Sequence, residues 1–278
     1  MLVTGITGRI GLSMLQELRA TGHTLRALTR SRPIDRIACL LDEQVQGDIQ
    51  DETSWQRALS DVDVVVHLAG ISHNVAGVLT ANILSTHTMA LACLAQGVRR
   101  IVFASSNCVL GHCDRASTQP FALDYLPIDE AHPLRPEADY GLSKSLAEQV
   151  LQAASRSGNL QVCALRFAWI WSDAMCTKRR TQSYDESAFA STLWAYVHAE
   201  DAACALRQAL ESPPAQDFCA MYISAADTTA DSPSLALVER YYGAAAAQAA
   251  NLPGHASLFA HHAAKQLIGY HPERSWRR

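Results

Sequence analysis

Tyr140 and Lys144 have the spacing of a proton-transfer pair. They stand four residues apart in a stretch of helical periodicity, so their side chains share one helix face. A buried ammonium beside a phenol favours the phenolate, and we therefore expect the pKa of Tyr140 to lie below its usual value of about 10. Such a phenol gives a proton to a carbonyl or takes one from a hydroxyl. Lys144 can also hold the ribose of a cofactor. An ordinary helix-surface pair is the alternative.

Two adjacent hydroxyls, Ser105 and Ser106, end the strand predicted over residues 99–106. Because side chains alternate along a strand, one of the two hydroxyls faces the crevice. We assign to Ser106 the donation of a hydrogen bond to the substrate oxygen as charge develops there, with Ser105 as its rival. A simple turn serine at the strand end is the other interpretation.

The first eleven residues predict a dinucleotide site. A strand end is followed by glycines at positions 5, 8 and 11, with the spacing Gly-x-x-Gly-x-x-Gly, and then by an apolar helical pattern. Gly5 permits a tight turn, Gly8 lets the backbone approach a pyrophosphate, and Gly11 lets the helix pack close to the strand. Unpaired N–H groups at the helix N-terminus favour an anion. The chain starts almost inside this strand, so we expect a residue or two upstream.

The second predicted strand, over residues 23–29, indicates the kind of dinucleotide. NAD-specific sites usually carry an acid roughly 20 residues beyond the glycines, where it binds the ribose 2′-hydroxyl. Here that place holds Arg30, which can pair with a 2′-phosphate that an acid would repel. Arg9 in the glycine turn could assist. The sequence therefore favours NADP over NAD, and solvated surface arginines are the alternative.

The ends of the third and fourth predicted strands add further contacts. Asp48 ends the strand at 45–49 and either binds the adenine amino group or caps the helix expected over 52–59. The apolar run at 61–70 is typical of a central parallel strand and ends in small residues that would lie against the nicotinamide. His67 is expected to be packed there rather than to act as a base. Two polar residues after this strand are better placed to face a substrate: Ser72 and His73.

Beyond Trp171 the pattern loosens. Residues 172–191 are polar and predict a mobile substrate loop, whose Lys178-Arg179-Arg180 cluster either binds an anionic group or, as we favour, forms a solvated charge run. The pair His261-His262 is expected to be exposed on a helix and not to bind a metal. The alanine tract at 244–250 suits a helix.

Composition bounds the class of protein. The 278 residues are 49% hydrophobic and 18% charged, with a net charge of −4, so no global basic field attracts nucleic acid. No apolar run approaches the ~20 residues that cross a bilayer. The eight cysteines lack a Cys-x-x-Cys pair, which indicates reduced thiols and a cytoplasmic protein. The fold class predicted is α/β, a Rossmann-type doubly wound parallel sheet over 1–168 with a small C-terminal substrate lobe over 169–278, of which 194–210 returns to the core.

Taken together, the motifs resemble the extended short-chain dehydrogenase/reductases, also called the NAD-dependent epimerase/dehydratase family. They are Thr4-Gly5-x-x-Gly8-x-x-Gly11, His67-Leu-Ala-Gly70, Asn82, Ser105-Ser106, Tyr140-x-x-x-Lys144, Leu165-Arg166 and Tyr196-Val-His198-x-x-Asp201. The resemblance implies a Ser-Tyr-Lys triad, sugar or nucleotide-sugar chemistry, a supporting role for Asn82, nicotinamide contact by the segment after Arg166, and a homodimer. Residues 104–107, the 70–72 turn and the short lobe are similar to the uronate dehydrogenase branch.

Four departures bear on what the resemblance implies. Phe167 stands where the family usually has proline, and Leu110 where it usually has tyrosine. Arg30 replaces the acid of strict NAD users. The C-terminal lobe is short for a clamp on a UDP-sugar.

The sequence as a whole predicts an enzyme that passes a hydride between NADP or NAD and a hydroxyl or carbonyl carbon of a sugar-like or small polar substrate. The alternatives are a sugar or nucleotide-sugar epimerase/dehydratase with retained cofactor and a non-catalytic dinucleotide-binding protein. No metal, nucleic acid or membrane partner is expected. The expected catalytic residues are Ser106, Tyr140 and Lys144; the substrate contacts are Ser72, His73, Ser106 and Asn107; the cofactor contacts are Thr4, Gly5, Thr7, Gly8, Arg9, Ile10, Gly11, Arg30, Asp48, Ile49, Leu68, Ala69, Gly70, Asn82, Tyr140, Lys144 and Phe167.

Overall fold

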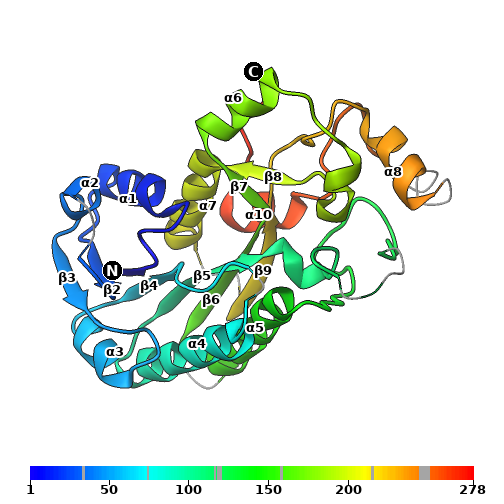
Figure 1. The fold of residues 1–278 in the computed structure, drawn as a ribbon. Coiled ribbons are helices and arrows are strands. Elements are labelled where there is room, and N and C mark those ends of the chain that lie inside the picture. The colour runs from blue at the N-terminus through cyan, green and yellow to red at the C-terminus, as the bar shows by residue number, and fades with distance from the viewer. Residues whose placement is uncertain are drawn as a thin grey trace.

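A seven-stranded parallel sheet forms the centre of the molecule (Figure 1). The computed structural model describes residues 1–32, 35–73, 75–115, 117, 121–156, 159–213, 216–243 and 251–278. The strand order is β3-β2-β1-β4-β5-β6-β9, and every neighbouring pair is parallel. The strands are β1 (Leu2–Thr4), β2 (Arg26–Thr29), β3 (Glu43–Gln46), β4 (Val64–His67), β5 (Arg100–Ser106), β6 (Gln161–Phe167) and β9 (Phe218–Ile223). The predicted doubly wound α/β fold is confirmed.

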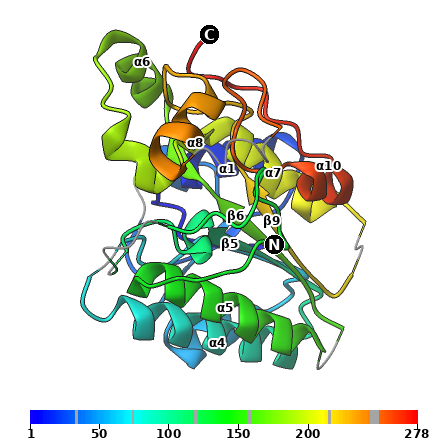
Figure 2. The same ribbon diagram turned by 90° about the vertical axis from the view of Figure 1, so that its right-hand side faces the viewer.

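Helices cover both faces of this sheet (Figures 1 and 2). One layer contains α3 (Glu52–Ala58), α4 (Val78–Ala95) and α5 (Asp139–Arg156); the other contains α1 (Gly11–Ala20), α7 (Ala199–Glu211) and α10 (His262–Ile268). The strand order reverses between β1 and β4, and doubly wound sheets bind ligands at the carboxyl ends of the strands beside such a reversal.

Each layer has its own hydrophobic core. Because side chains alternate along β4, Val65 packs with the α3–α5 layer and Val66 with the α1–α7 layer. The same alternation places Leu2 and Val3 of β1 in opposite cores. A strand buried on both faces explains the uninterrupted apolar run that predicted a central parallel strand.

Helix α4 is, within the described part of the chain, the one helix long and apolar enough by length and composition to cross a membrane. In the fold it packs beside α5, and Met89 and Cys93 enter the same core as Ile101 of the sheet. This packing accounts for the buried apolar residues of the helix.

The C-terminal lobe contains a second, two-stranded parallel sheet of β7 (Trp169–Trp171) and β8 (Tyr196–His198). Three helical segments accompany it: α6 (Asp173–Thr181), η2 (Ser187–Thr192) and α8 (Ser234–Tyr242). Strand β9 and helix α7 return from this part of the chain to the central sheet and to α1. Two short elements complete the described fold: α2 (Asp35–Ala38) and η1 (Asn107–Leu110).

The prediction of a loop over 172–191 is therefore wrong, since most of this segment forms the helices α6 and η2. Arg179 explains the difference, since its buried guanidinium pairs with Asp231 at 2.7 Å and lies 4.2 Å from the Tyr184 ring centre and 4.0 Å from that of Trp276. It also donates to the carbonyl of Thr229. This arginine is neither solvated nor available to a substrate; it holds the lobe together.

His261 also differs from its prediction. Its ring is half-buried just before α10, and its Nε2 lies 2.8 Å from the Ser224 hydroxyl, so the residue is packed rather than exposed. No group of three or more metal-ligating side chains occurs among the described residues. The alanine tract at 244–250 lies outside the described residues.

Candidate active site

The glycine turn joins β1 to α1 as the sequence predicts. Gly5 has a φ of +71°, and a Cβ there would lie 2.5 Å from the amide nitrogen of Ala69. A Cβ at Gly11 would overlap the backbone of Ile6. Only glycine therefore allows the turn to lie against the residues after β4, and the start of α1 to lie against Ile6 of the turn.

Thr4 supports this turn from inside the fold rather than lining a cavity. Its hydroxyl lies 2.8 Å from His67 Nδ1 and accepts a hydrogen bond from the amide of Ala69. Burial lowers the pKa of His67 to about 3, so the ring is neutral and packed, as expected. Thr4 and Gly11 were expected to contact the cofactor, but neither is among the cavity-lining residues of the described chain.

A cavity of about 310 Å³ opens at the carboxyl ends of β1, β2 and β3. Arg30 lines it with an exposed side chain that makes no hydrogen bond or ion pair to any described residue. Nine other predicted cofactor contacts line the same cavity: Gly5, Thr7, Gly8, Asp48, Ile49, Leu68, Ala69, Gly70 and Asn82.

Asp48 does not cap α3, which removes one of its two interpretations. The cap is Asp51, whose carboxylate accepts from the amides of Thr53 and Ser54 and whose pKa is lowered to about 2 by hydrogen bonds from those two residues. The carboxylate of Asp48 instead accepts from the amide of Gln50 at the cavity wall.

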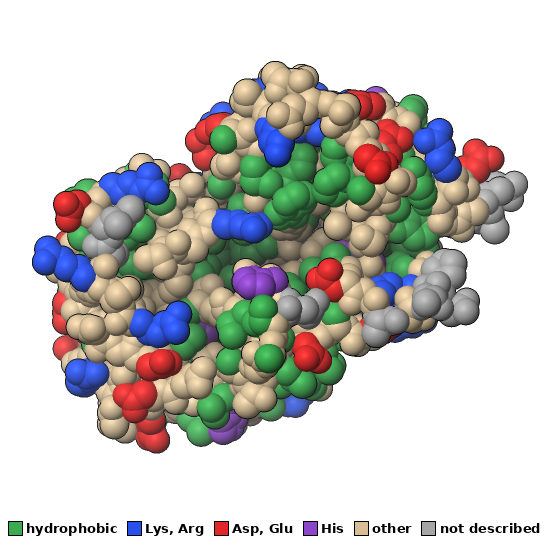
Figure 3. Space-filling model, viewed as in Figure 1, with side chains coloured by type: hydrophobic (Ala, Val, Ile, Leu, Met, Phe, Trp, Pro, Cys, Tyr) green, Lys and Arg blue, Asp and Glu red, His purple; other side chains and the backbone are tan. Residues whose placement is uncertain are grey.

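A second cavity, of about 360 Å³, continues from the first and shares Gly5, Gly8, Leu68, Gly70 and Ile71 with it. Figure 3 shows the hollowed face of the molecule, with hydrophobic side chains on the wall that the C-terminal lobe contributes. The predicted residues that line this cavity, besides the shared ones, are Arg9, Ile10, Ser72, Ser106, Asn107, Tyr140, Lys144 and Phe167. His73 is exposed and lies outside the lining.

The two serines at the end of β5 face different partners. Ser106 accepts from the amide of Cys108 and shares a hydrogen bond with the phenol of Tyr140. Ser105 donates to the carboxylate of Glu148 at 2.6 Å. Alternation along β5 thus brings Ser106, rather than Ser105, to the phenol.

Lys144 is buried on the first turns of α5. Its ammonium donates to the carbonyl of Ala104 at 2.8 Å and lies 4.7 Å from the Phe103 ring centre. Burial lowers the pKa of Lys144 to about 8, against an opposing effect of Glu148. A Cβ on Gly70 would lie 3.6 Å from the ammonium, so the side chain reaches the loop that follows β4.

The pKa of Tyr140 is raised, not lowered as predicted. Burial is the largest cause, followed by the charge of Cys108, while the hydrogen bond to Ser106 and the charge of Arg9 act in the opposite direction. Lys144 is not among these causes, and its ammonium contacts Ala104 and Phe103 instead. The phenol therefore keeps its proton at neutral pH, which suits a proton donor.

Asn82 connects the loop after β4 to the helix that carries the phenol. Its side chain accepts from the amide of Ile71 at 2.9 Å and donates to the Ser143 hydroxyl at 3.0 Å. Ser143 in turn donates to the carbonyl of Tyr140 at 2.7 Å. This chain of hydrogen bonds fixes the distance between the two walls of the cavity.

Several lining residues are absent from the sequence-based prediction. They come from η1, from the loop after it and from the C-terminal lobe: Cys108, Cys113, Asp114, Trp169, Ile170, Thr192 and Ala195. The two cysteines share a hydrogen bond beside Tyr140. Strand-end position alone could have singled out Trp169, which comes two residues after Phe167.

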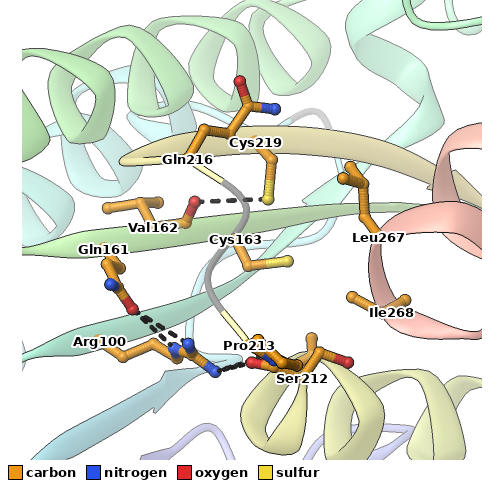
Figure 4. Close-up of a pocket in the computed structure, with 11 residues that line it drawn as sticks. Arg100, Gln161, Val162, Cys163, Ser212, Pro213, Gln216, Cys219, Leu267 and Ile268 are labelled. Carbon is orange, nitrogen blue, oxygen red and sulfur yellow. Dashed lines mark hydrogen bonds between the residues drawn. The ribbon is translucent and has the colours of Figure 1, made fainter.

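A third, much smaller cavity of about 30 Å³ lies at the opposite, amino-terminal edge of the sheet (Figure 4). Arg100 there donates to the side chain of Gln161 and to the carbonyl of Ser212, which follows α7. Cys163 and Cys219 are register partners on β6 and β9 beside it. The arginine joins β5, β6 and the end of α7.

The two connected cavities at the carboxyl ends of the strands suit an extended dinucleotide. The glycine turn and the N-terminus of α1 lie where they meet, Arg30 and Asp48 lie at one end, and Lys144 lies at the other. Gly70 leaves open the space between Asn82 and Lys144, since a Cβ there would lie 3.2 Å from Asn82 Oδ1. The residues present therefore fit such a cofactor.

Comparison with known proteins gives three results. A family model described as the NAD dependent epimerase/dehydratase family matches residues 1–219. A ketoreductase of 4-hydroxy-2-methyl-3-oxo-4-farnesyl-3,4-dihydroquinoline-1-oxide from Stigmatella aurantiaca is 32% identical over 174 residues, 60% of this chain and 49% of that protein. The uronate dehydrogenase of Pseudomonas syringae pv. tomato is 32% identical over 152 residues, 54% of this chain and 52% of that protein. The chain thus spans about half the length of these curated relatives.

Among solved structures, a short-chain dehydrogenase/reductase superfamily protein from Agrobacterium tumefaciens with bound NAD has a TM-score of 0.74 and 23% identity. The match covers 100% of this chain and 93% of that chain. It supports the fold described above.

Proposed function

The chain belongs to the NAD dependent epimerase/dehydratase family, and we propose that it is an NAD(P)-dependent oxidoreductase. In this proposal a hydride passes between the nicotinamide and a hydroxyl or carbonyl carbon of a sugar-like or other small polar substrate. One observation carries it: Ser106, Tyr140 and Lys144 line one cavity, and this cavity continues into the glycine turn.

Tyr140 is the proton donor in this proposal. Its raised pKa keeps the phenol protonated at neutral pH, so the group can protonate the carbonyl oxygen of a substrate that is being reduced. Ser106, hydrogen-bonded to the same phenol, donates to that oxygen as negative charge develops. The nicotinamide, when bound, supplies or accepts the hydride.

Lys144 is the ribose anchor in this proposal. Its ammonium reaches the Gly70 loop, where the ribose next to the nicotinamide would lie, and Phe167 lines the same cavity for contact with the ring. Asn82 positions the helix start through Ser143 and does not itself move a proton. In this proposal Lys144 and Phe167 therefore contact the cofactor, whereas Asn82 only positions the helix that carries Tyr140 and Lys144.

NADP is the proposed cofactor, with NAD as its alternative. Arg30 lines the adenosine end of the cavity with an exposed guanidinium, which can pair with a 2′-phosphate. Arg9 adds positive charge to the glycine turn. Asp48 lines the same cavity, and we propose that its carboxylate accepts a hydrogen bond from the adenine amino group.

Purified protein tests the proposal against its alternatives. A dehydrogenase or reductase changes the nicotinamide absorbance in proportion to the substrate converted. An epimerase or dehydratase retains cofactor through gel filtration and converts substrate without a net absorbance change. Bound cofactor with conversion of no substrate in a panel of sugars, sugar acids and small ketones would contradict the enzymatic proposal.

We also propose a homodimer in the cytoplasm. Leu84 and Leu91, seven residues apart on α4, are 44% and 55% exposed and share one face of the helix. All eight cysteines are free thiols, which agrees with a reducing compartment. Light scattering of the protein and of a Leu84→Glu, Leu91→Glu double variant tests the dimer; a monomeric parent protein contradicts it.

A further inference from the structure

We propose that the substrate is an uncharged compound whose apolar face packs on Trp169, and that Asp114 excludes anionic substrates. The inference rests on the proposed function and names the substrate class for the same site. Two chemistries present such a face beside a carbonyl or carbinol: the C–H face of a neutral sugar, and an alkyl or aryl ketone.

Trp169 forms a rigid apolar wall. Its ring stacks on Phe189 at 5.9 Å with an interplanar angle of 18°, and meets the edge of Trp171 at 5.6 Å. Phe189 stacks in turn on Tyr184 at 4.6 Å. Two aromatic partners, one of them backed by Tyr184, thus hold an indole that is still 36% exposed and lines the cavity. Such a surface gains stability when an apolar group covers it.

Trp169 is close in sequence to the residue expected to contact the nicotinamide, Phe167. Trp169 is separated by Ala168 from Phe167, and all three residues line the cavity that contains Tyr140. The apolar part of a substrate on the indole would therefore lie beside the position where the hydride is transferred. The adjoining Ile170 and Ala195 extend the apolar lining.

The charges of the cavity argue against an anion at the substrate end. Among the described lining residues the cations are Arg9, which belongs to the glycine turn, and Lys144, whose ammonium is bound to Ala104. The acid is Asp114, whose negative charge lies close enough to the thiols of Cys108 and Cys113 to act on both. A carboxylate or a diphosphate placed there meets a like charge without a dedicated cation.

The inference is tested by calorimetric binding to the Tyr140→Phe protein saturated with oxidised cofactor, so that turnover does not interfere. D-galactose and D-galacturonate form a matched pair that differs by one carboxylate, and ethyl benzoylacetate represents the aryl ketones. We expect the better neutral ligand to bind at least tenfold more tightly than galacturonate. Tighter galactose identifies the sugar source, and tighter ethyl benzoylacetate identifies the ketone source.

Two variants assign the preference to the named residues. Trp169→Ala weakens the better neutral ligand at least tenfold, whereas Leu235→Ala, an exposed apolar residue of α8 outside the cavity, leaves its affinity unchanged. Asp114→Asn improves galacturonate binding several-fold. Trp169→Phe keeps a ring for packing and gives an intermediate loss.

Galacturonate binding as tightly as the neutral ligands, no binding by either neutral ligand, or an unchanged affinity in Trp169→Ala overturns the inference. Those results leave the proposed function standing if nicotinamide turnover with another substrate depends on Tyr140. Conversely, Trp169-dependent binding without any turnover in the parent protein refutes the proposed function alone.

Discussion

Glu148 and Arg166 form a bidentate ion pair beneath the end of the strand that carries Ser106. The two contacts measure 3.0 and 2.8 Å, and both side chains are at most 7% exposed. The carboxylate also accepts from Ser105, so α5, β5 and β6 meet at one charged group. The carboxylate of Glu148 therefore joins the helix of the proton donor to β5, the strand of Ser106, through Ser105, and to β6 through Arg166.

Removing one member of this pair will destabilise the protein. Glu148→Gln leaves the Arg166 guanidinium buried without its counter-charge, and we expect a loss of about 3 kcal/mol in the free energy of unfolding. Urea unfolding measures it. Asp63→Asn, in the exposed pair with Arg99, is the matched control and should change little. Equal losses in the two variants would refute a special role for the buried pair.

Tyr140→Phe should lower turnover by at least ~10²-fold while cofactor affinity stays within a few-fold, because the phenyl ring keeps the packing and loses the proton. Steady-state kinetics and cofactor titration measure the two quantities. Tyr125→Phe removes an exposed phenol that bonds Asp129 and serves as the control. Undiminished turnover in Tyr140→Phe would remove this residue from the mechanism.

Lys144 makes stability depend on pH. Its pKa is about 8 in the folded protein against an ordinary value of 10.5, so between these values the unfolded chain binds more protons and stability rises with pH. The cost of burying the charged ammonium is present in full below pH 8 and is absent above pH 10.5. We therefore expect the stability of the parent protein relative to Lys144→Met to increase across this window in urea titrations. Lys265→Met, at an exposed lysine, should show no such trend.

Arg30→Asp should shift the cofactor preference toward NAD by at least about tenfold. The substitution replaces a group that pairs with a 2′-phosphate by one that repels it and accepts from a 2′-hydroxyl. The ratio of the dissociation constants for NADP and NAD reports the shift. Arg32→Asp changes the same charge outside the cavity lining and should leave the ratio near that of the parent protein.

Local signals explain which parts of the site were predictable. The glycine turn, the strand before it and the Tyr140–Lys144 helix face each depend on contacts within a few residues, and the sequence states them directly. The fold class follows from the buried run of β4, since only a strand covered on both faces is apolar throughout. The alternation of side chains along a strand indicated that one of Ser105 and Ser106 faces the cavity, and it was the only sequence signal for choosing between them.

Long-range packing explains what was missed. Arg179 and His261 look like surface residues in the sequence, yet partners far along the chain, Asp231 and Ser224, bury them. The raised pKa of Tyr140 depends on burial and on the charge of Cys108, which η1 brings to the phenol. Periodicity and spacing carry no information on such encounters.

Ala168 is the residue at which the chain leaves the central sheet for the lobe. Its amide donates to the carbonyl of Ile223, so the departure point is fastened to β9. Phe167 and Trp169, on either side of it, thus lie on one segment that is held in place, and no hinge separates them. A substitution at position 169 can therefore change which substrate binds without moving the Phe167 backbone beside the nicotinamide site. Substrate specificity in this fold can then evolve by single substitutions at this position.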